Sequence, residues 1–253
     1  MTTQPDIQAL VDAFGLPPGA RVDMRVPKKL LAEQGAPTAA DKRIIQDGID
    51  ELQWFAACKP TTIGVPSFKD DTREYLEIAV VACALRPKAR AARLVELIHR
   101  AIPYPVLLIT TDADGTALSL AHKRQAEREA GRIVIDRVVS SGPIGQTDVD
   151  AAFLASLALA GLTRHNLNTL YDGWIARVEA LLAARRSGVY RASDDAGAVQ
   201  RRRAALEAHN RLVREMDVLR AKAGRERQLN RRVDLNMQIQ RLQAALAEQL
   251  SDL

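Results

Sequence analysis

The chain has 253 residues, and its 36 Lys and Arg against 31 Asp and Glu give a formal net charge of +5. Aromatic residues make up only 4% of the chain, which argues against a surface that stacks single-stranded bases on aromatic rings. No apolar run approaches the length of a membrane-spanning helix, and the N-terminus lacks a secretory pattern. We therefore expect a cytoplasmic protein with no membrane partner.

The charge is distributed unevenly along the chain. Residues 201–253 hold twelve Lys and Arg against seven Asp and Glu, whereas residues 1–200 hold twenty-four of each. The whole surplus of positive charge therefore lies in the C-terminal tail. The pattern predicts a neutral globular body that carries a basic arm.

Short helices and strands alternate in the first part of the chain. We expect a helix at 5–15, a strand at 20–26, helical turns at 28–34, a helix at 38–56 and a strand at 61–65. Val22, Met24 and Val26 would share one face of the first strand. Thr38 would cap the long helix, which would bury Ile49, Leu52 and Phe55.

The centre of the chain predicts a strand–helix–strand unit. Residues 75–85 are apolar on both faces, as in a central strand, and are followed by an amphipathic helix at 89–102 and an apolar strand at 105–111. Such a unit favours a parallel strand pair with a right-handed crossover. A turn at 112–115 leads into a hairpin strand at 116–122, and 132–140 alternates as a further strand. The body is thus α/β with a mixed sheet.

The chain becomes helical after Thr147, which is expected to cap a helix that Gly161 ends. A second helix is expected at 167–186, and 187–198 has the composition of a linker. We therefore divide the chain into an α/β body (1–145), a helical extension (146–190) and an Arg-rich helical or coiled-coil-like arm (191–253).

The arm carries two apolar stripes at helical spacing. The first includes Leu212, Met216 and Leu219, with Arg203, Arg214 and Arg225 on the opposite side of the helix. The second has the 4-3-4 spacing of coiled-coil core positions. The stripes are out of register, so either the helix breaks near Gly224 into a hairpin or each half meets a different partner. The residues expected to bind a partner are Leu212, Met216, Leu219, Leu235, Ile239, Leu242 and Leu246.

Two basic clusters in the body are candidate nucleic-acid contacts. His122, Lys123 and Arg124 end a hairpin strand, where cations can position a phosphate backbone. The alternative for this cluster is a solvated strand end that discourages edge pairing. Lys28 and Lys29 form the second cluster.

Glu77 and Asp112 are the weak catalytic candidates. Carboxylates at the ends of neighbouring strands can hold a divalent metal for phosphodiester cleavage. However, Glu77 lacks a lysine two residues later, and Asp112 is better explained as a turn former. The sequence contains no phosphate loop, nucleophile elbow or histidine ligand pair. We therefore expect no metal and no cofactor, and we favour a non-catalytic role while keeping an enzymatic one as the alternative.

Several segments, taken in order, resemble the bacterial family known as domain of unknown function 4391. They are Arg25–Lys29, Ala39–Arg43, Glu51–Trp54, Tyr75–Ile78, Ile102–Pro105, Ser119–Arg124, Arg225–Asn230 and Val233–Asn236. Members of this family tend to be encoded beside DNA methyltransferases and helicases, in restriction-modification or phage-defence clusters. The resemblance implies an accessory role in such a system and carries over no catalytic residues.

Two functional hypotheses follow. The first is a non-catalytic adaptor that docks onto a helicase or DNA methyltransferase, with DNA contact by the arm and homodimerisation through the C-terminal helices as further expectations. The second is a divergent metal-dependent, nuclease-like enzyme that acts on DNA in the same type of system.

Overall fold

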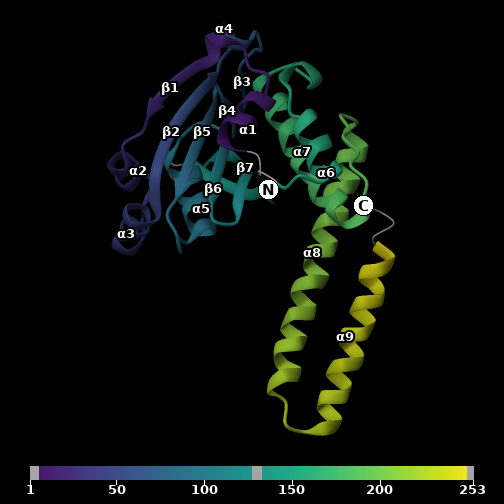
Figure 1. Ribbon diagram of the computed structural model, residues 1–253. Helices are drawn as coiled ribbons and strands as arrows, with labels where there is room; N and C mark the ends of the chain where they lie inside the picture. The colour runs from purple at the N-terminus through teal and green to yellow at the C-terminus, as the bar shows by residue number, and fades with distance from the viewer. Residues whose placement is uncertain (1–5, 127–132, 250–253) are drawn as a thin grey trace. The chain divides into compact units, whose positions relative to one another are not determined.

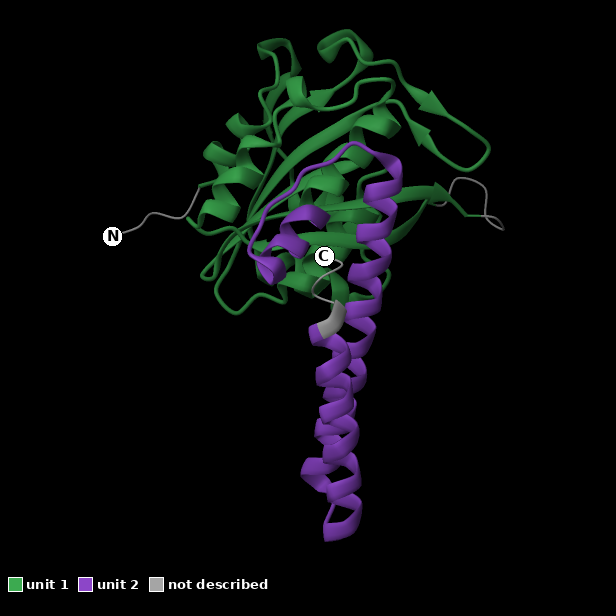
Figure 2. Ribbon diagram, turned by 90° about the vertical axis from the view of Figure 1, so that its right-hand side faces the viewer, with its two compact units in different colours: residues 1–178 green, residues 179–253 purple. Residues whose placement is uncertain are grey.

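The computed structural model describes residues 6–126 and 133–249. The chain divides into two compact units, residues 1–178 and residues 179–253 (Figure 2). Of the stretch 146–190 that was expected as a helical extension, the residues up to 178 belong to the first unit and the rest to the second. Within the described part of the chain, no helix combines the length and apolar composition that crossing a bilayer requires.

A mixed six-stranded sheet forms the centre of the first unit (Figure 1). Its strands are β1 (Arg21–Arg25), β2 (Ile49–Cys58), β5 (Ile78–Leu85), β6 (Val106–Asp112), β7 (Gly115–Gln125) and β8 (Ile133–Pro143), and they lie in that order across the sheet. Strands β5 and β6 are parallel, and all other neighbours are antiparallel. The predicted α/β fold with a βαβ unit and a hairpin is therefore confirmed.

Helices cover both faces of this sheet. They are α1 (Ile7–Ala13), α2 (Lys28–Gly35), α3 (Ala39–Gly48), α4 (Pro60–Ile63), α5 (Ala91–Ala101), α6 (Asp148–Ala155) and α7 (Leu167–Ser187), and a small sheet pairs β3 (Phe68–Lys69) with β4 (Glu74–Tyr75). Odd-numbered residues of β5, such as Ala79 and Val81, join the cluster that includes Leu31 of α2, Ile45 of α3 and Leu97 of α5. Burial of both faces explains why β5 is apolar without alternation.

The helix predicted at 38–56 is wrong in its second half. Thr38 caps α3 as expected, because its hydroxyl accepts a hydrogen bond from the Asp41 N–H at 3.1 Å. The helix ends at Gly48, however, and Ile49–Cys58 forms strand β2 between β1 and β5. The residues Ile49, Leu52 and Phe55 are buried as predicted, but in a strand whose register with β5 shifts twice. Because each shift interrupts the alternation of the two faces, the buried residues of this strand are three positions apart, as they would be in a helix.

Two other expectations for short segments fail for local reasons. The strand predicted at 61–65 is helix α4, which starts with Pro60 in its first turn and ends at Gly64 with φ +67°. Strand β1 is present, but Asp23 has φ +48° at an irregularity in its pairing with β2. The expected common face is therefore lost, and Met24 is 57% exposed.

The helical predictions after Thr147 are largely confirmed. Thr147 caps α6 by accepting a hydrogen bond from the Asp150 N–H, but the helix ends at Ala155 and Gly161 closes a separate 3-10 turn. Helix α7 matches its prediction within one residue.

The second unit contains an antiparallel helical hairpin. Helix α8 (Ala196–Arg225) and helix α9 (Leu229–Gln249) pack against one another and are joined by a turn at 226–228 (Figure 1). The predicted break near Gly224 thus occurs two residues later. Of the two arrangements left open by the sequence, the structure has the hairpin.

Glycine at position 35 permits the close packing of α2 on α5. A Cβ atom there would lie 2.4 Å from the Ala101 Cβ and 2.8 Å from the Leu97 carbonyl oxygen, whereas one at Gly19 would meet nothing within 4 Å. We predict that Gly35→Ala lowers the free energy of unfolding by about 1–3 kcal/mol, because the helices must separate. The matched variant Gly19→Ala should change it by less than about 0.5 kcal/mol in the same urea titration. Equal effects would contradict the packing constraint.

Candidate functional site

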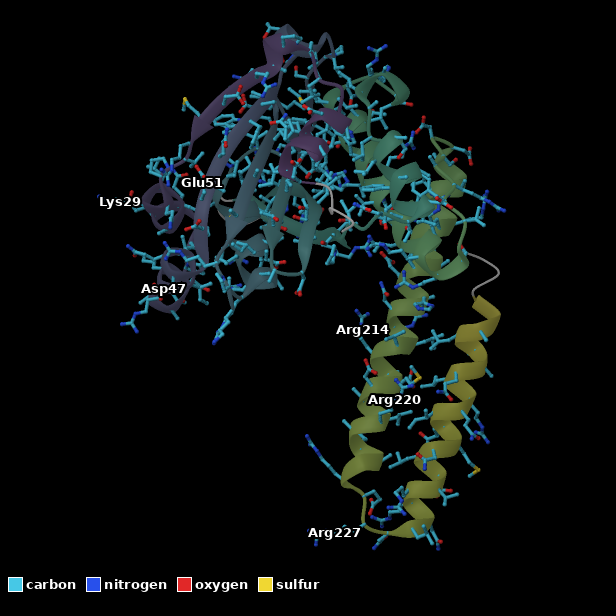
Figure 3. All side chains as sticks on the ribbon, viewed as in Figure 1. Lys29, Asp47, Glu51, Arg214, Arg220 and Arg227 are labelled. Atoms are coloured by element: carbon cyan, nitrogen blue, oxygen red, sulfur yellow. The ribbon has the colours of Figure 1, made fainter. Side chains whose placement is uncertain are left out.

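Helices α2 and α3 and strands β1 and β2 line a cleft of about 830 Å³. This volume lies within the usual range for ligand sites. The cleft is lined by the cations Arg25, Lys28, Lys29, Lys42 and Arg86, the acids Glu33, Asp47, Asp50 and Glu51, and apolar residues that include Val26, Ile45 and Leu52. Figure 3 shows Lys29, Asp47 and Glu51, which come from three different elements of the cleft. Opposite charges and an apolar base suit a peptide or a small ligand of mixed polarity.

Most charged side chains of this cleft form ion pairs or hydrogen bonds within the protein. Lys29 pairs with Glu33 at 3.8 Å, and Arg86 pairs with Asp50 at 3.4 Å. Such exposed pairs contribute little stability and exchange readily for other partners. Lys28 is held more firmly, because its Nζ donates a hydrogen bond to the Ile49 carbonyl. The structure therefore brings the predicted residues Lys28 and Lys29 together, but beside enough carboxylates to weaken attraction to a polyanion.

The predicted cluster of His122, Lys123 and Arg124 does not form one surface. Successive residues of β7 point to opposite faces of the sheet. Arg124 pairs with Asp136 at 3.2 Å, and Lys123 is only 5% exposed. The expectation that these three cations jointly meet a phosphate backbone finds no support in this geometry.

Lys123 instead holds the C-terminal end of α5. Its Nζ donates hydrogen bonds to the backbone carbonyls of Ile102 and Tyr104, which follow the last turn of that helix. Carbonyls at a helix C-terminus lack partners within the helix and attract cations. Burial acts in the opposite direction and lowers the pKa of Lys123 to about 7.

His122 belongs to a hydrogen-bonded chain that sequence reasoning missed. Its Nε2 lies 2.9 Å from Asp172 Oδ1 on α7, and its Nδ1 lies 2.5 Å from the Tyr75 hydroxyl. An ionised carboxylate can only accept, so Nε2 donates to Asp172; in the neutral ring, Nδ1 then accepts from the Tyr75 hydroxyl. Burial raises the pKa of Tyr75, which keeps its hydroxyl a donor. No sequence signal links Asp172 to His122 fifty residues earlier.

The two carboxylates proposed for metal binding lie at opposite ends of the sheet. In the parallel pair, Ala79 is opposite Val106 and Ala84 is opposite Thr111. Glu77 therefore precedes the start of β5, whereas Asp112 ends β6, about 25 Å away along the strands. Glu77 pairs with Lys59 at 3.0 Å, and Asp112 accepts a hydrogen bond from the Asp114 N–H in its turn. The hypothesis of a shared metal at adjacent strand ends is wrong. Among the described residues, no three His, Cys, Asp or Glu side chains form a group suited to a metal.

The residues predicted to bind a partner lie within the hairpin. Met216 is 7% exposed, and the other six (Leu212, Leu219, Leu235, Ile239, Leu242 and Leu246) are partly buried. Because α8 and α9 pack together, the two stripes shield each other at least in part. Arg203, predicted on the wet side, donates to both carboxylate oxygens of Glu179 at 3.0 and 3.2 Å. Arg214 remains exposed on the side of α8 away from α9 (Figure 3).

A second apolar stripe of α9 stays exposed. Leu229, Val233 and Met237 are 63%, 48% and 47% exposed. Their spacing of four residues places them on one face of the helix, away from the stripe that contains Leu235 and Ile239.

The family model for Domain of unknown function (DUF4391) matches residues 14–246. The match covers most of the chain, which therefore belongs to this family. Neither the curated proteins nor the solved structures gave a match.

The segments that carry the resemblance meet in two places in the first unit. Arg25–Lys29, Ala39–Arg43 and Glu51–Trp54 each contribute residues to the cleft. Hydrogen bonds connect the next three segments, Tyr75–Ile78, Ile102–Pro105 and Ser119–Arg124. Tyr75 contacts His122, and Lys123 donates to the carbonyls of Ile102 and Tyr104.

We predict that Lys123 makes stability depend on pH. In the unfolded chain a lysine titrates near pH 10.4, whereas in the fold the pKa of Lys123 is about 7. Between these values the unfolded state binds more protons, so the free energy of unfolding contributed by this group rises with pH. Urea titrations measure the change in the free energy of unfolding from pH 7 to pH 9.5. This free energy should rise less, or fall more, for Lys123→Met than for the unaltered protein. An identical pH dependence in the two proteins would contradict the assignment.

We predict that Glu77 acts only in an ion pair. Glu77→Gln should lower the free energy of unfolding by about 1 kcal/mol, since the contact with Lys59 is lost. Asp112→Asn should change it by less than about 0.5 kcal/mol. Melting with and without Mg²⁺ checks the alternative. A Mg²⁺-dependent rise in the melting temperature that both substitutions remove would restore the metal site.

Proposed function

We propose that the protein is a cytoplasmic, non-catalytic accessory subunit of a DNA restriction-modification or phage-defence system. In this proposal the helical hairpin docks onto the system's helicase or DNA methyltransferase. The type of system is taken from the family resemblance, and the docking role is argued from the hairpin itself.

The exposed stripe on α9 is the observation that carries the docking role. Leu229, Val233 and Met237 expose large apolar side chains on three successive turns. Contiguous exposed apolar surface is unfavourable in water and marks interaction sites. The hairpin does not need this stripe for its own packing, because α9 presents other residues to α8. A partner surface would complete the burial.

The polar residues beside the stripe favour a protein as the occupant. Asn230, Asn236 and Gln240 flank it, and all three are exposed and uncharged, whereas the exposed Arg241 continues the spacing of the stripe beyond Met237. Protein interfaces are depleted in charge at their core and enriched in methionine. A phosphate backbone would instead require cations at these positions.

We predict that the triple variant Leu229→Ser, Val233→Ser and Met237→Ser loses the partner. The tagged full chain, expressed in its native host, should retain the helicase or methyltransferase on purification, and the variant should retain less than about a tenth as much. Mass spectrometry of the retained proteins measures this ratio.

The matched control removes three apolar side chains of similar exposure elsewhere. Met24→Ser, Leu30→Ser and Leu76→Ser, which are 57%, 48% and 54% exposed in the native protein, should leave retention unchanged. Equal retention by the α9 variant would overturn the docking role. A second outcome would also overturn it: the unaltered chain sediments as a dimer and the α9 variant as a monomer. The stripe would then be covered by a second copy of the chain.

A further inference from the structure

The outer face of α8 differs chemically from that of α9. Arg211, Arg214, Lys222 and Arg225 are all exposed, and their spacing of 3, 8 and 3 residues places them on one side of the helix. They extend from residue 211 to residue 225, which is about 21 Å of helix axis. We call these four residues the α8 cationic face. One arm thus presents an apolar face on one helix and a basic face on the other.

The charges of the α8 cationic face are not neutralised within the described chain. None of its four members lies within ion-pair distance of a described carboxylate, although Glu215 borders the face. Two other arginines of the same unit are paired: Arg203 contacts Glu179 at 3.0 Å, and Arg220 contacts Asp217 at 3.5 Å. The four free cations therefore create a positive potential that an anionic partner can neutralise.

The composition of the arm indicates which polyanion suits this face. Three of the four cations are arginines, whose guanidinium groups bind phosphate oxygens in pairs. Residues 191–253 contain no Phe, Trp or Tyr. The arm therefore lacks the aromatic rings on which single-stranded bases stack and those that anchor helices at a membrane surface. A duplex, which presents phosphates and hides its bases, is the polyanion that fits.

We propose that the α8 cationic face binds the phosphate backbone of double-stranded DNA without sequence preference. This binding extends the proposed function, because it would hold the docked partner on its substrate. It does not rest on that function, since the purified chain alone should bind a duplex. Failure of DNA binding and failure of partner docking are therefore separate results.

Fluorescence anisotropy of a labelled 30-base-pair duplex, titrated with the full chain, tests the proposal. Four phosphate contacts predict a slope of about −3.6 for the logarithm of the association constant against the logarithm of the salt concentration, or about 150-fold weaker binding at 200 mM than at 50 mM. The variant Arg211→Gln, Arg214→Gln, Lys222→Gln and Arg225→Gln should bind at least about 30-fold more weakly at 50 mM salt. Its slope should fall close to zero.

A control variant separates the face from the overall charge. Arg43→Gln, Lys88→Gln, Arg90→Gln and Arg164→Gln remove the same charge from exposed positions of the first unit and should change affinity less than about threefold. Equal losses in both variants would overturn the proposal, as would duplex binding that the first variant leaves intact. Stronger binding to poly-glutamate than to the duplex at equal charge would also overturn it, in favour of an acidic protein. Circular dichroism should show unchanged helix content in each variant.

Discussion

The pairing of two apolar stripes within one chain determines what the arm can offer to other molecules. Leu212, Met216 and Leu219 of α8 and the stripe of α9 that contains Leu235 and Ile239 are shielded by the hairpin. Each helix then has one outward face. On α8 that face carries four cations around the exposed Val218, and on α9 it carries the apolar stripe, which Arg241 follows. The two proposals, a protein partner for α9 and a duplex for α8, both follow from this single packing constraint.

In the body, the parallel pairing of β5 and β6 has a comparable effect. It requires the crossover helix α5, and Lys123 of the adjoining hairpin strand supplies donors to the carbonyls at the end of that helix. The same pairing separates Glu77 from Asp112 by the length of the sheet. Three of the residues that the sequence predicts as binding or catalytic candidates therefore have structural roles. Lys123 binds the carbonyls at the end of α5, Glu77 forms an ion pair with Lys59, and His122 connects β7 to α7.

The elements with one dominant period were predictable from the sequence. The buried strand β5, the amphipathic helix α5 and the apolar strand β6 appear within two or three residues of their predicted bounds. Strand β2 was not predictable, because its irregular pairing spaces Ile49, Leu52 and Phe55 as a helix would. The cleft and the contact between His122 and Asp172 are formed by residues far apart in the chain. Of these residues, the sequence predicts only Lys28, Lys29 and His122 as functional candidates. The stripes of the arm were identified correctly, but their partner is in the same chain.

The central claim is that the hairpin closes on itself in the free protein. Hydrogen–deuterium exchange of the full chain, measured at 1 μM and 50 μM, tests it most directly. The account predicts that amides of residues 212–223 and 235–246 are protected, and equally so at both concentrations. Rapid exchange in both helices, or protection that increases with concentration, would show that the stripes pair with another chain and would contradict the account.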